Sequence, residues 1–178
     1  YEISACLVGL GDVYKRQDPK QAAAVTRAIK DSTNLPVIVK LSPNVTDIVT
    51  IAKAVEDAGA DSLSLVNTLL GLAIDVRTRR PILGNITGGF AGPAIKPVAL
   101  RMVWQVAKAV NIPVSGLGGI MTGIDAIEFM MAGADTVQIG TANIIDPNAM
   151  ERIADEMDEW CDKNGVKDIQ EIVGTLKA

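Results

Sequence analysis

Asn34-Leu35-Pro36-Val37 and Asn111-Ile112-Pro113-Val114 are two copies of one strand entry, and each leads into the same turn, Ala-Gly-Ala-Asp, at 58–61 and at 132–135. In both copies a strand is followed by a helix-length segment and then by the glycine turn into the next strand. Repetition of a βαβ unit favours a (β/α) barrel over an open sheet, because barrels are built from such units. The repeat therefore predicts an α/β fold with a parallel sheet.

The rest of the chain continues this alternation. The predicted strands are residues 36–40, 61–66, 112–115 and 136–139. The predicted helices are residues 18–30, which start with Asp18-Pro19, then 46–58, 96–110, 124–131, 146–162, which start with Asp146-Pro147, and 166–176. This order predicts the (β/α)8 TIM-barrel class, here a truncated C-terminal part of about four βα units, since a closed barrel needs eight.

Residues 69–90 break the alternation, because they show no helical period and contain several glycines and arginines. They predict a long loop or a short hairpin, and loops of this length inside compact domains are usually functional. Within the strands, we expect the aliphatic residues to include the side chains that face the barrel interior. These aliphatic residues are Val37, Val39, Leu63, Leu65, Val137 and Ile139.

The first 17 residues fit this pattern poorly. Residues 4–17 have neither a helical nor a strand period, and residues 8–17 resemble the adapter-derived tails of truncated reading frames. We therefore expect residues 1–17 to be non-native, or a residual upstream strand followed by adapter-like sequence. Residues 18–178 are expected to be the C-terminal part of a single barrel domain.

The composition excludes several classes of function. Hydrophobic residues make up 48% and charged residues 21% of the 178 residues, which is a globular balance. The net charge of −4 gives no case for nucleic-acid binding. Because there is no membrane-length apolar run, no secretory signal and only two distant cysteines, we expect a reduced, cytoplasmic setting. The absence of histidine rules out Ser-His-Asp hydrolysis and most zinc sites, and we expect no metal.

Polar residues stand at the ends of two predicted strands, where ligands bind in parallel α/β proteins. Lys40 ends an apolar strand and is followed by the turn Ser42-Pro43-Asn44. Either its ammonium group reaches solvent at the sheet edge, or it balances negative charge on a ligand ring or phosphate. Asn67 and Thr68 follow the next strand. Alone they could be an ordinary cap, but beside Lys40 they indicate recognition of a polar planar ligand.

Two glycine corners follow the last two predicted strands, Gly116-Leu117-Gly118-Gly119 and Gly140-Thr141. The first is not the GxGxxG dinucleotide fingerprint. Paired corners that expose backbone N–H groups, with a helix N-terminus nearby, nevertheless match the usual phosphate site of barrels. Elsewhere, Asp61 and Asp135 occupy matching positions of the repeat and are predicted to be structural, and Cys161 is predicted to pack within a helix.

Longer motifs carry a resemblance to a known family. The stretches VKLSPNVT at 39–46, VNTL at 66–69, PILGNITGGFAGPAIKP at 81–97, Gly118-Gly119 and MAGADTVQIGTAN at 131–143 closely resemble the catalytic subunits of class 1B dihydroorotate dehydrogenases, which are FMN-containing barrels of pyrimidine synthesis. The likeness runs from near Asp18 to the C-terminus. The GPAIKP run and the long NITGG segment are far more specific than any glycine pair.

The resemblance implies a role for each strand-end residue. Lys40 would lie against the FMN ring, where a cation stabilises the anionic reduced flavin, and Val66 and Gly92 would add flavin contacts. Asn67 and Thr68 would face the pyrimidine substrate. The residues implied to hold the ribityl phosphate are Gly118, Gly119, Gly140 and Thr141.

The chain departs from the family at the catalytic base. Members carry this base, a cysteine, in an Ile-Ser-Cys-Pro-Asn context shortly before a Gly-Thr-Asp-Pro helix start. Here Tyr1-Glu2-Ile3-Ser4 resembles the strand leading there, but Ala5-Cys6-Leu7-Val8 follows it. Cys6 falls close to the expected place, yet its neighbours look like adapter sequence. We interpret the match as accidental and leave the base unidentified.

The resemblance implies oxidation of (S)-dihydroorotate to orotate, with a base removing the C5 proton and hydride passing from C6 to FMN. Electrons would leave through a partner subunit with FAD and a 2Fe-2S cluster and end on NAD. The full-length protein would be an oligomer, and we expect little or no activity from this chain alone. Class 1A members use fumarate and need no partner, and the catalytic barrel discriminates weakly between the classes.

Two readings outside the family stay open. One is a phosphate-binding barrel synthase or isomerase without a flavin, which explains the glycine corners but not Lys40 with Asn67 and Thr68. The other is an inactive half-barrel that only binds phosphate ligands or self-associates to cover its open sheet edges.

Overall fold

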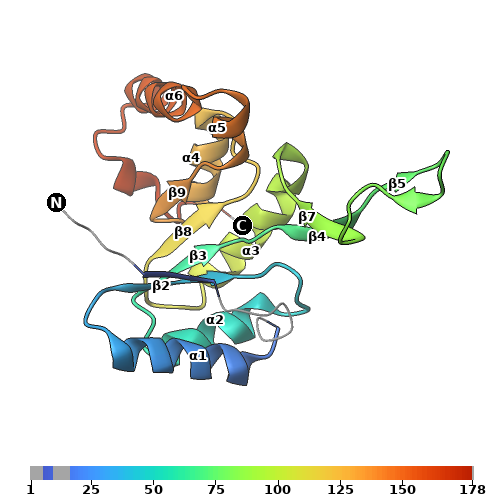
Figure 1. Cartoon of the computed structure of the whole chain (residues 1–178). Helices are drawn as coiled ribbons and strands as arrows, with labels where there is room; N and C mark the ends of the chain where they lie inside the picture. The colour runs from blue at the N-terminus through green and yellow to red at the C-terminus, as the bar shows by residue number, and fades with distance from the viewer. Residues whose placement is uncertain (1–5, 10–16, 178) are drawn as a thin grey trace.

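The computed structural model of the chain describes the backbone of residues 6–9 and all atoms of residues 17–177. Five parallel strands form one sheet in the order β1-β2-β3-β8-β9 (Figure 1). Their bounds are β1 Cys6–Gly9, β2 Val37–Leu41, β3 Ser62–Leu65, β8 Val114–Leu117 and β9 Thr136–Gln138. The order of these strands in the sheet follows the chain, without the reversal that marks an open doubly wound sheet. The sheet therefore has the arrangement of part of a (β/α)8 barrel, as the sequence predicts.

β1 lies in the first 17 residues, upstream of the predicted strands. Its backbone pairs in parallel with β2, with Cys6 opposite Val37 and Gly9 opposite Lys40. Residues 6–9 therefore form a strand although residues 4–17 show no strand period, and the described part of the chain has five parallel strands in this sheet, one more than the four predicted from residue 18 onward. A segment this short cannot display a period, and it becomes a strand through pairing. The adapter origin proposed for residues 1–17 stays a prediction, because residues 1–5 and 10–16 lie outside the described residues.

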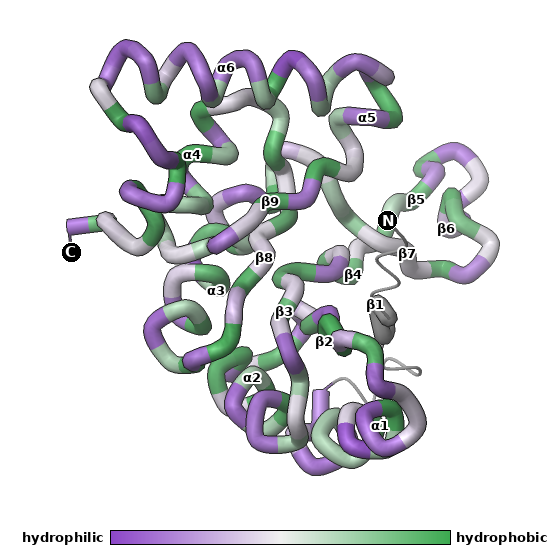
Figure 2. Tube along the Cα trace, turned by 90° about the vertical axis from the view of Figure 1, so that its left-hand side faces the viewer, coloured by the Kyte–Doolittle hydropathy of each residue, from purple (hydrophilic) through white to green (hydrophobic). Residues whose placement is uncertain are grey.

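Helices connect the parallel strands at bounds close to those predicted. They are α1 Pro19–Ser32, α2 Ile48–Asp57, α3 Lys96–Ala107, α4 Gly123–Met131, α5 Thr141–Ile145 and α6 Ala149–Asn164, with the short 3-10 helices η1 Pro93–Ile95 and η2 Ile169–Ile172. Asp18 caps α1 by accepting a 2.9 Å hydrogen bond from the N–H of Lys20, as the Asp-Pro start predicts. In Figure 2, α2, α3 and α4 lie to one side of the strands, and the antiparallel strands lie to the other.

The C-terminal quarter differs from the prediction. Asp146 does not start α6: it ends the unpredicted helix α5, and its carboxylate accepts from the N–H of Asn148, the residue before α6. Residues 166–176 are not a helix, because Gly165 at φ 68° ends α6 and Asp168 caps only the single turn of η2. None of the helices within the described residues combines the length and the apolar character needed to cross a membrane.

The two faces of the parallel sheet differ in composition. Every second strand residue packs against the helices in one core with Val103 of α3 and Phe129 of α4. On this face Val37, Val39, Leu41, Leu63 and Leu65 are all 0% exposed. Because side chains alternate along a strand, Lys40, Ser64 and Ser115 face away from the helices. The expectation that the aliphatic residues face the barrel interior is therefore wrong: they face the helices.

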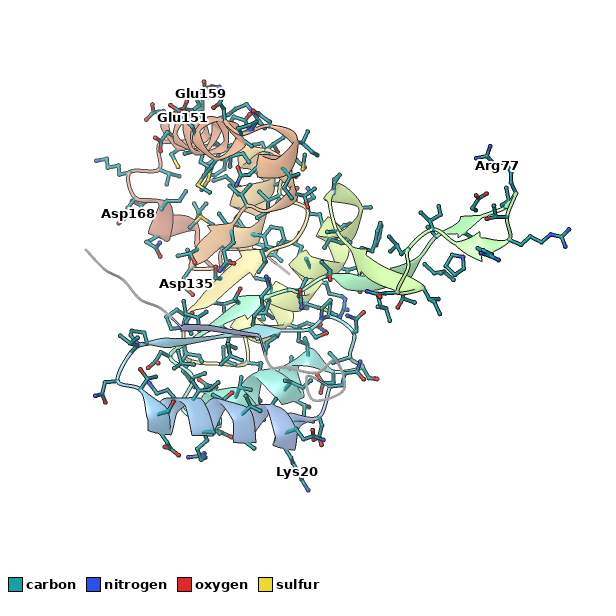
Figure 3. All side chains as sticks on the ribbon, in the orientation of Figure 1. Lys20, Arg77, Asp135, Glu151, Glu159 and Asp168 are labelled. Carbon is teal, nitrogen blue, oxygen red and sulfur yellow. The ribbon has the colours of Figure 1, made fainter. Side chains whose placement is uncertain are left out.

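Residues 69–90 form a projecting structure that we call the arm (Figure 1). Strand β4 Leu69–Leu72 pairs antiparallel with β7 Thr87–Phe90, and β5 Ile74–Asp75 pairs with β6 Arg80–Pro81. Arg77 stands at the far end (Figure 3). The predicted hairpin is confirmed. Its base lies at the carboxyl ends of the parallel strands, since Thr68 precedes β4 and Ala91 follows β7.

The repeat seen in the sequence builds the opposite, amino end of the sheet. The carboxylate of Asp61 accepts from the N–H of Val37 at 2.6 Å, and the carboxylate of Asp135 (labelled in Figure 3) accepts from the N–H of Val114 at 2.8 Å. In each copy the Asp N–H also donates back to the carbonyl of the same valine. Asp61 and Asp135 are thus equivalent braces between neighbouring strands, and their predicted structural role is confirmed.

Candidate active site

A cavity of about 340 Å³ lies at the carboxyl ends of β2, β3, β8 and β9, under the base of the arm. All nine residues predicted to contact cofactor or substrate line it. They are Lys40, Val66, Asn67, Thr68, Gly92, Gly118, Gly119, Gly140 and Thr141. The six lining residues that the sequence did not single out are Ala91, Ile95, Leu117, Ile120, Gln138 and Ile144. A larger cavity of about 440 Å³, at the amino end of β8, contains none of the predicted residues.

Lys40 enters the cavity from the polar face of the sheet. It stands between Val39 and Leu41, which are both buried against the helices, so its side chain points the other way. Register places it beside Ser64 of β3. Lys40 is partly buried and lines the cavity, which favours the interpretation as a ligand-facing cation over that of a solvent-facing lysine.

Asn44 fixes the loop that carries Asn67 and Thr68. Its Nδ2 donates to the carbonyl of Thr68 at 3.0 Å, and its Oδ1 accepts from the N–H of Leu70 at 2.9 Å. The side-chain amide therefore binds the loop after β3 as a strand partner would. The hydroxyl oxygen of Ser42 accepts hydrogen bonds from the backbone N–H and from Nδ2 of Asn44, which holds the amide in place. The sequence placed Asn44 only in an exit turn, because nothing local shows that its partners lie on the next strand's loop.

Gly118 and Gly119 are required by the packing of the chain itself. Gly118 has φ +132°, and a Cβ there would lie 2.7 Å from the Cβ of Ala99. Gly119 has φ +80°, and its Cβ would lie 2.8 Å from the carbonyl oxygen of Gly92. Both conformations favour glycine, and the second brings the loop after β8 into contact with the loop after the arm.

Gly140 differs from this pair. Its φ is −108°, and a Cβ built on it meets nothing within 4 Å. Packing within the described residues therefore does not require a glycine here. The free space opens into the cavity that Gly140 and Thr141 line, so it suits a group that approaches the backbone closely. The residues present therefore fit a phosphate at this corner.

The N-terminus of α4 is already occupied by carboxylates. The side chain of Glu156 accepts from the N–H of Gly123, and that of Asp125 accepts from the N–H groups of Met121 and Thr122. The hydrogen bond from Gly123, followed by the contact with Arg152, lowers the pKa of Glu156, so this carboxylate is charged at neutral pH. The N–H groups of Met121, Thr122 and Gly123 are therefore already paired within the protein, and the candidate phosphate donors are the backbone N–H groups of the two glycine corners.

The catalytic base has no assignment among the described side chains. Cys6 lies on β1, where the structure describes the backbone alone. Cys161 lies on α6 and does not line the cavity, and burial together with Asp158 and Asp162 raises the pKa of its thiol. Its predicted packing role agrees with these surroundings. Within residues 17–177, no cluster of acidic or cysteine side chains has the composition of a metal site.

Comparisons with known proteins identify the family of this chain. The family model described as dihydroorotate dehydrogenase matches residues 3–160. A protein of Geobacter metallireducens, named dihydroorotate dehydrogenase B (NAD(+)), catalytic subunit, is 60% identical over 98% of this chain and 57% of its own length. Proteins of the same name from Geobacter sulfurreducens and Desulforamulus reducens are 60% identical over 98% and 61% identical over 88% of the chain. The chain thus spans about half the length of these relatives. It belongs to the dihydroorotate dehydrogenase family.

Proposed function

We propose that this chain forms the part of a dihydroorotate dehydrogenase catalytic subunit that holds the FMN phosphate and one side of the flavin and substrate. The whole protein would oxidise (S)-dihydroorotate to orotate. The observation that carries the proposal is that one cavity is lined by all nine residues to which the resemblance gives flavin or pyrimidine contacts. Family membership supports the same reaction.

The residues divide the cavity into two parts. FMN, when bound, accepts the hydride that leaves the substrate. Lys40 places a positive charge where negative charge develops on a ligand, and a partly buried cation stabilises such charge more than one in bulk water. Asn67 and Thr68 bring an amide and a hydroxyl to the substrate side, held there by Asn44.

The glycine corners form the other part. Gly118 and Gly119 keep the loop after β8 close to Gly92, and Gly140 leaves room for phosphate oxygens beside the backbone N–H groups of the loop after β9. Val66, buried at the end of β3, supplies an apolar contact for the ring. The proton at C5 must be taken by a base that we do not place among residues 17–177.

The name of the relatives supports a proposal for the partner. They are called catalytic subunits of an NAD(+) enzyme, which implies that a second subunit passes electrons to NAD. We propose that this chain's whole protein likewise works with an electron-transfer subunit that carries FAD and a 2Fe-2S cluster. An oligomeric full-length protein stays part of the proposal.

The test needs a protein of full length. Joining residues 17–178 of this chain to the part of the Geobacter metallireducens relative that precedes them in the alignment gives what we call the completed protein, and the relative then supplies the segment in which the resemblance places the base. Purified completed protein should show the visible absorbance of bound flavin, and anaerobic dihydroorotate should bleach it. Bound flavin that stays oxidised in the presence of dihydroorotate would contradict the proposed substrate. A colourless protein that also fails to take up added FMN would contradict the cofactor.

A further inference from the structure

Gln138 at the end of β9 is a polar cavity residue to which the proposed function gives no role. Register places Thr136 beside Ser115 and Gln138 beside Leu117, so the Gln138 side chain lies on the face of the sheet that points away from the helices. Lys40 and Ser64 share that face. Of the polar residues in these strand interiors, Gln138 and Lys40 line the cavity, whereas the two serines lie outside its lining.

Two buried serines hold the Gln138 amide. The hydroxyl of Ser64 donates to Oε1 of Gln138 at 3.4 Å, and Nε2 of Gln138 donates to Oγ of Ser115 at 3.0 Å. Ser64 is 0% and Ser115 is 7% exposed. Burying a hydroxyl costs free energy unless it is paired. The arrangement therefore fixes the position and the orientation of one amide at the cavity floor.

The amide retains hydrogen-bonding capacity. A glutamine side chain has two N–H donors and an oxygen with two lone pairs, and the serines use one of each. One donor and one acceptor position remain on a group without charge. That pair matches a ligand edge on which a carbonyl and an N–H alternate, whereas an ammonium group such as that of Lys40 has no acceptor to offer to such an edge.

We propose that Gln138 is a ligand-binding residue that hydrogen-bonds the cyclic imide edge of the molecule in this cavity, held in place by Ser64 and Ser115. This inference rests on the proposed function. A cyclic imide edge occurs on the flavin ring and also on dihydroorotate and orotate, and the shared chemistry is a ring N–H between two carbonyl groups. The test separates the two sources.

The experiment compares Gln138→Leu with Gln105→Leu in the completed protein. Gln105 lies on α3, outside the cavity lining, and accepts from Arg101, so it is a matched control. FMN affinity is measured by quenching of free-flavin fluorescence in the stripped protein, and orotate affinity by the change that it causes in the bound-flavin spectrum. The thermal midpoint of the flavin-free protein is recorded for every variant.

Loss of one or two hydrogen bonds predicts a dissociation constant on the order of tenfold higher in Gln138→Leu, for FMN if the flavin edge is bound and for orotate if the substrate edge is bound. Gln105→Leu should match the parent in both titrations. Ser115→Ala keeps the amide but removes one support, so we expect a smaller loss in the same titration. This variant carries the test if Gln138→Leu does not fold.

Unchanged FMN and orotate affinities in both Gln138→Leu and Ser115→Ala would overturn the inference while leaving the proposed function intact. Loss of thermal stability without any change in the two affinities would also overturn it, because the network would then be structural. If the unmodified completed protein binds no flavin, the proposed function fails and the inference fails with it.

Discussion

The two faces of one sheet are made from alternate residues of the same strands, and they differ in almost every property. Toward the helices, Val39 and Leu63 are fully buried among aliphatic neighbours. Away from them, Lys40 and Gln138 line the cavity, and the buried Ser64 hydrogen-bonds Gln138. Neighbouring residues of one strand therefore serve different purposes. A substitution on the face toward the helices should change the free energy of unfolding. A substitution on the opposite face should change ligand binding or the rate of flavin reduction.

Leu63→Ala should produce the largest effect on stability. Its side chain is fully buried against α3, so truncation should lower the free energy of unfolding of the completed protein by about 3 kcal/mol. Ser64→Ala, one residue along on the opposite face, loses a single long hydrogen bond and should cost about 1 kcal/mol or less. Urea unfolding of both variants measures the difference, and equal costs would remove the distinction between the faces.

Lys40→Met should strongly lower the rate of flavin reduction and leave stability nearly unchanged. We expect the completed protein to fold normally, while dihydroorotate reduces its flavin on the order of a hundredfold more slowly, because the charge opposite the ligand is gone. Stopped-flow absorbance measures the rate. Lys53→Met, on the exposed side of α2, is the control and should behave like the parent. Parent-like reduction by Lys40→Met would contradict the assignment.

The glycine corners give a sharper test, since they are glycine for different reasons. Gly119→Ala should lower the thermal midpoint of the flavin-free protein, because its Cβ would collide with the Gly92 carbonyl and its φ is +80°. Gly140→Val should leave that midpoint nearly unchanged and weaken FMN binding by about tenfold, because the new side chain fills free space in the cavity. Equal FMN affinity in Gly140→Val and the parent would argue against a phosphate there.

The smallest expected effect lies at the amino end of the sheet. The hydrogen bond from Lys30, then that from the Val37 N–H, lowers the pKa of Asp61. A lowered folded-state pKa contributes stability above the unfolded value of 3.8, and this contribution is lost as pH falls through the folded pKa. Asp61→Asn should therefore destabilise slightly at neutral pH and less in acid, as thermal unfolding at several pH values would show.

Asp135 supplies the comparison for this prediction. It makes the same bond to a strand N–H but, within the described residues, no ion pair. Added salt should therefore shrink the effect of Asp61→Asn and leave that of Asp135→Asn unchanged, since the Asp61 carboxylate is 43% exposed and screened by ions. A salt-independent Asp61→Asn effect would mean that Lys30 contributes nothing.

The sequence was sufficient to predict the cavity residues at the ends of the strands, but not the cavity residue inside a strand. Lys40, Asn67 and Gly140 could be predicted because polar residues and glycines at the carboxyl ends of parallel strands have few structural reasons to be there. Gln138 was missed since one polar residue inside a short strand looks like ordinary alternation, and its partners Ser64 and Ser115 are distant in the chain.

The face on which the aliphatic strand residues lie was predicted wrongly. Val37 and Val39 were expected to face the barrel interior, yet Lys40 stands between Val39 and Leu41 and was itself assigned to the ligand side. Because neighbouring residues point to opposite faces, that assignment already required Val39 to face the helices. The sequence therefore already indicated which residues of the strand face the helices. In contrast, β1 forms through pairing with β2, and the end of α6 depends on the positive φ of Gly165. No local sequence pattern predicts either feature.

We propose that the corner at Gly140-Thr141 receives the phosphate of a flavin. Titrating the stripped completed protein with FMN and, separately, with riboflavin tests it most directly, because the two ligands differ only by that phosphate. We expect FMN to bind on the order of a hundredfold more tightly than riboflavin, and Gly140→Val to remove most of the difference. Equal affinities for the two ligands in the unmodified protein would contradict it.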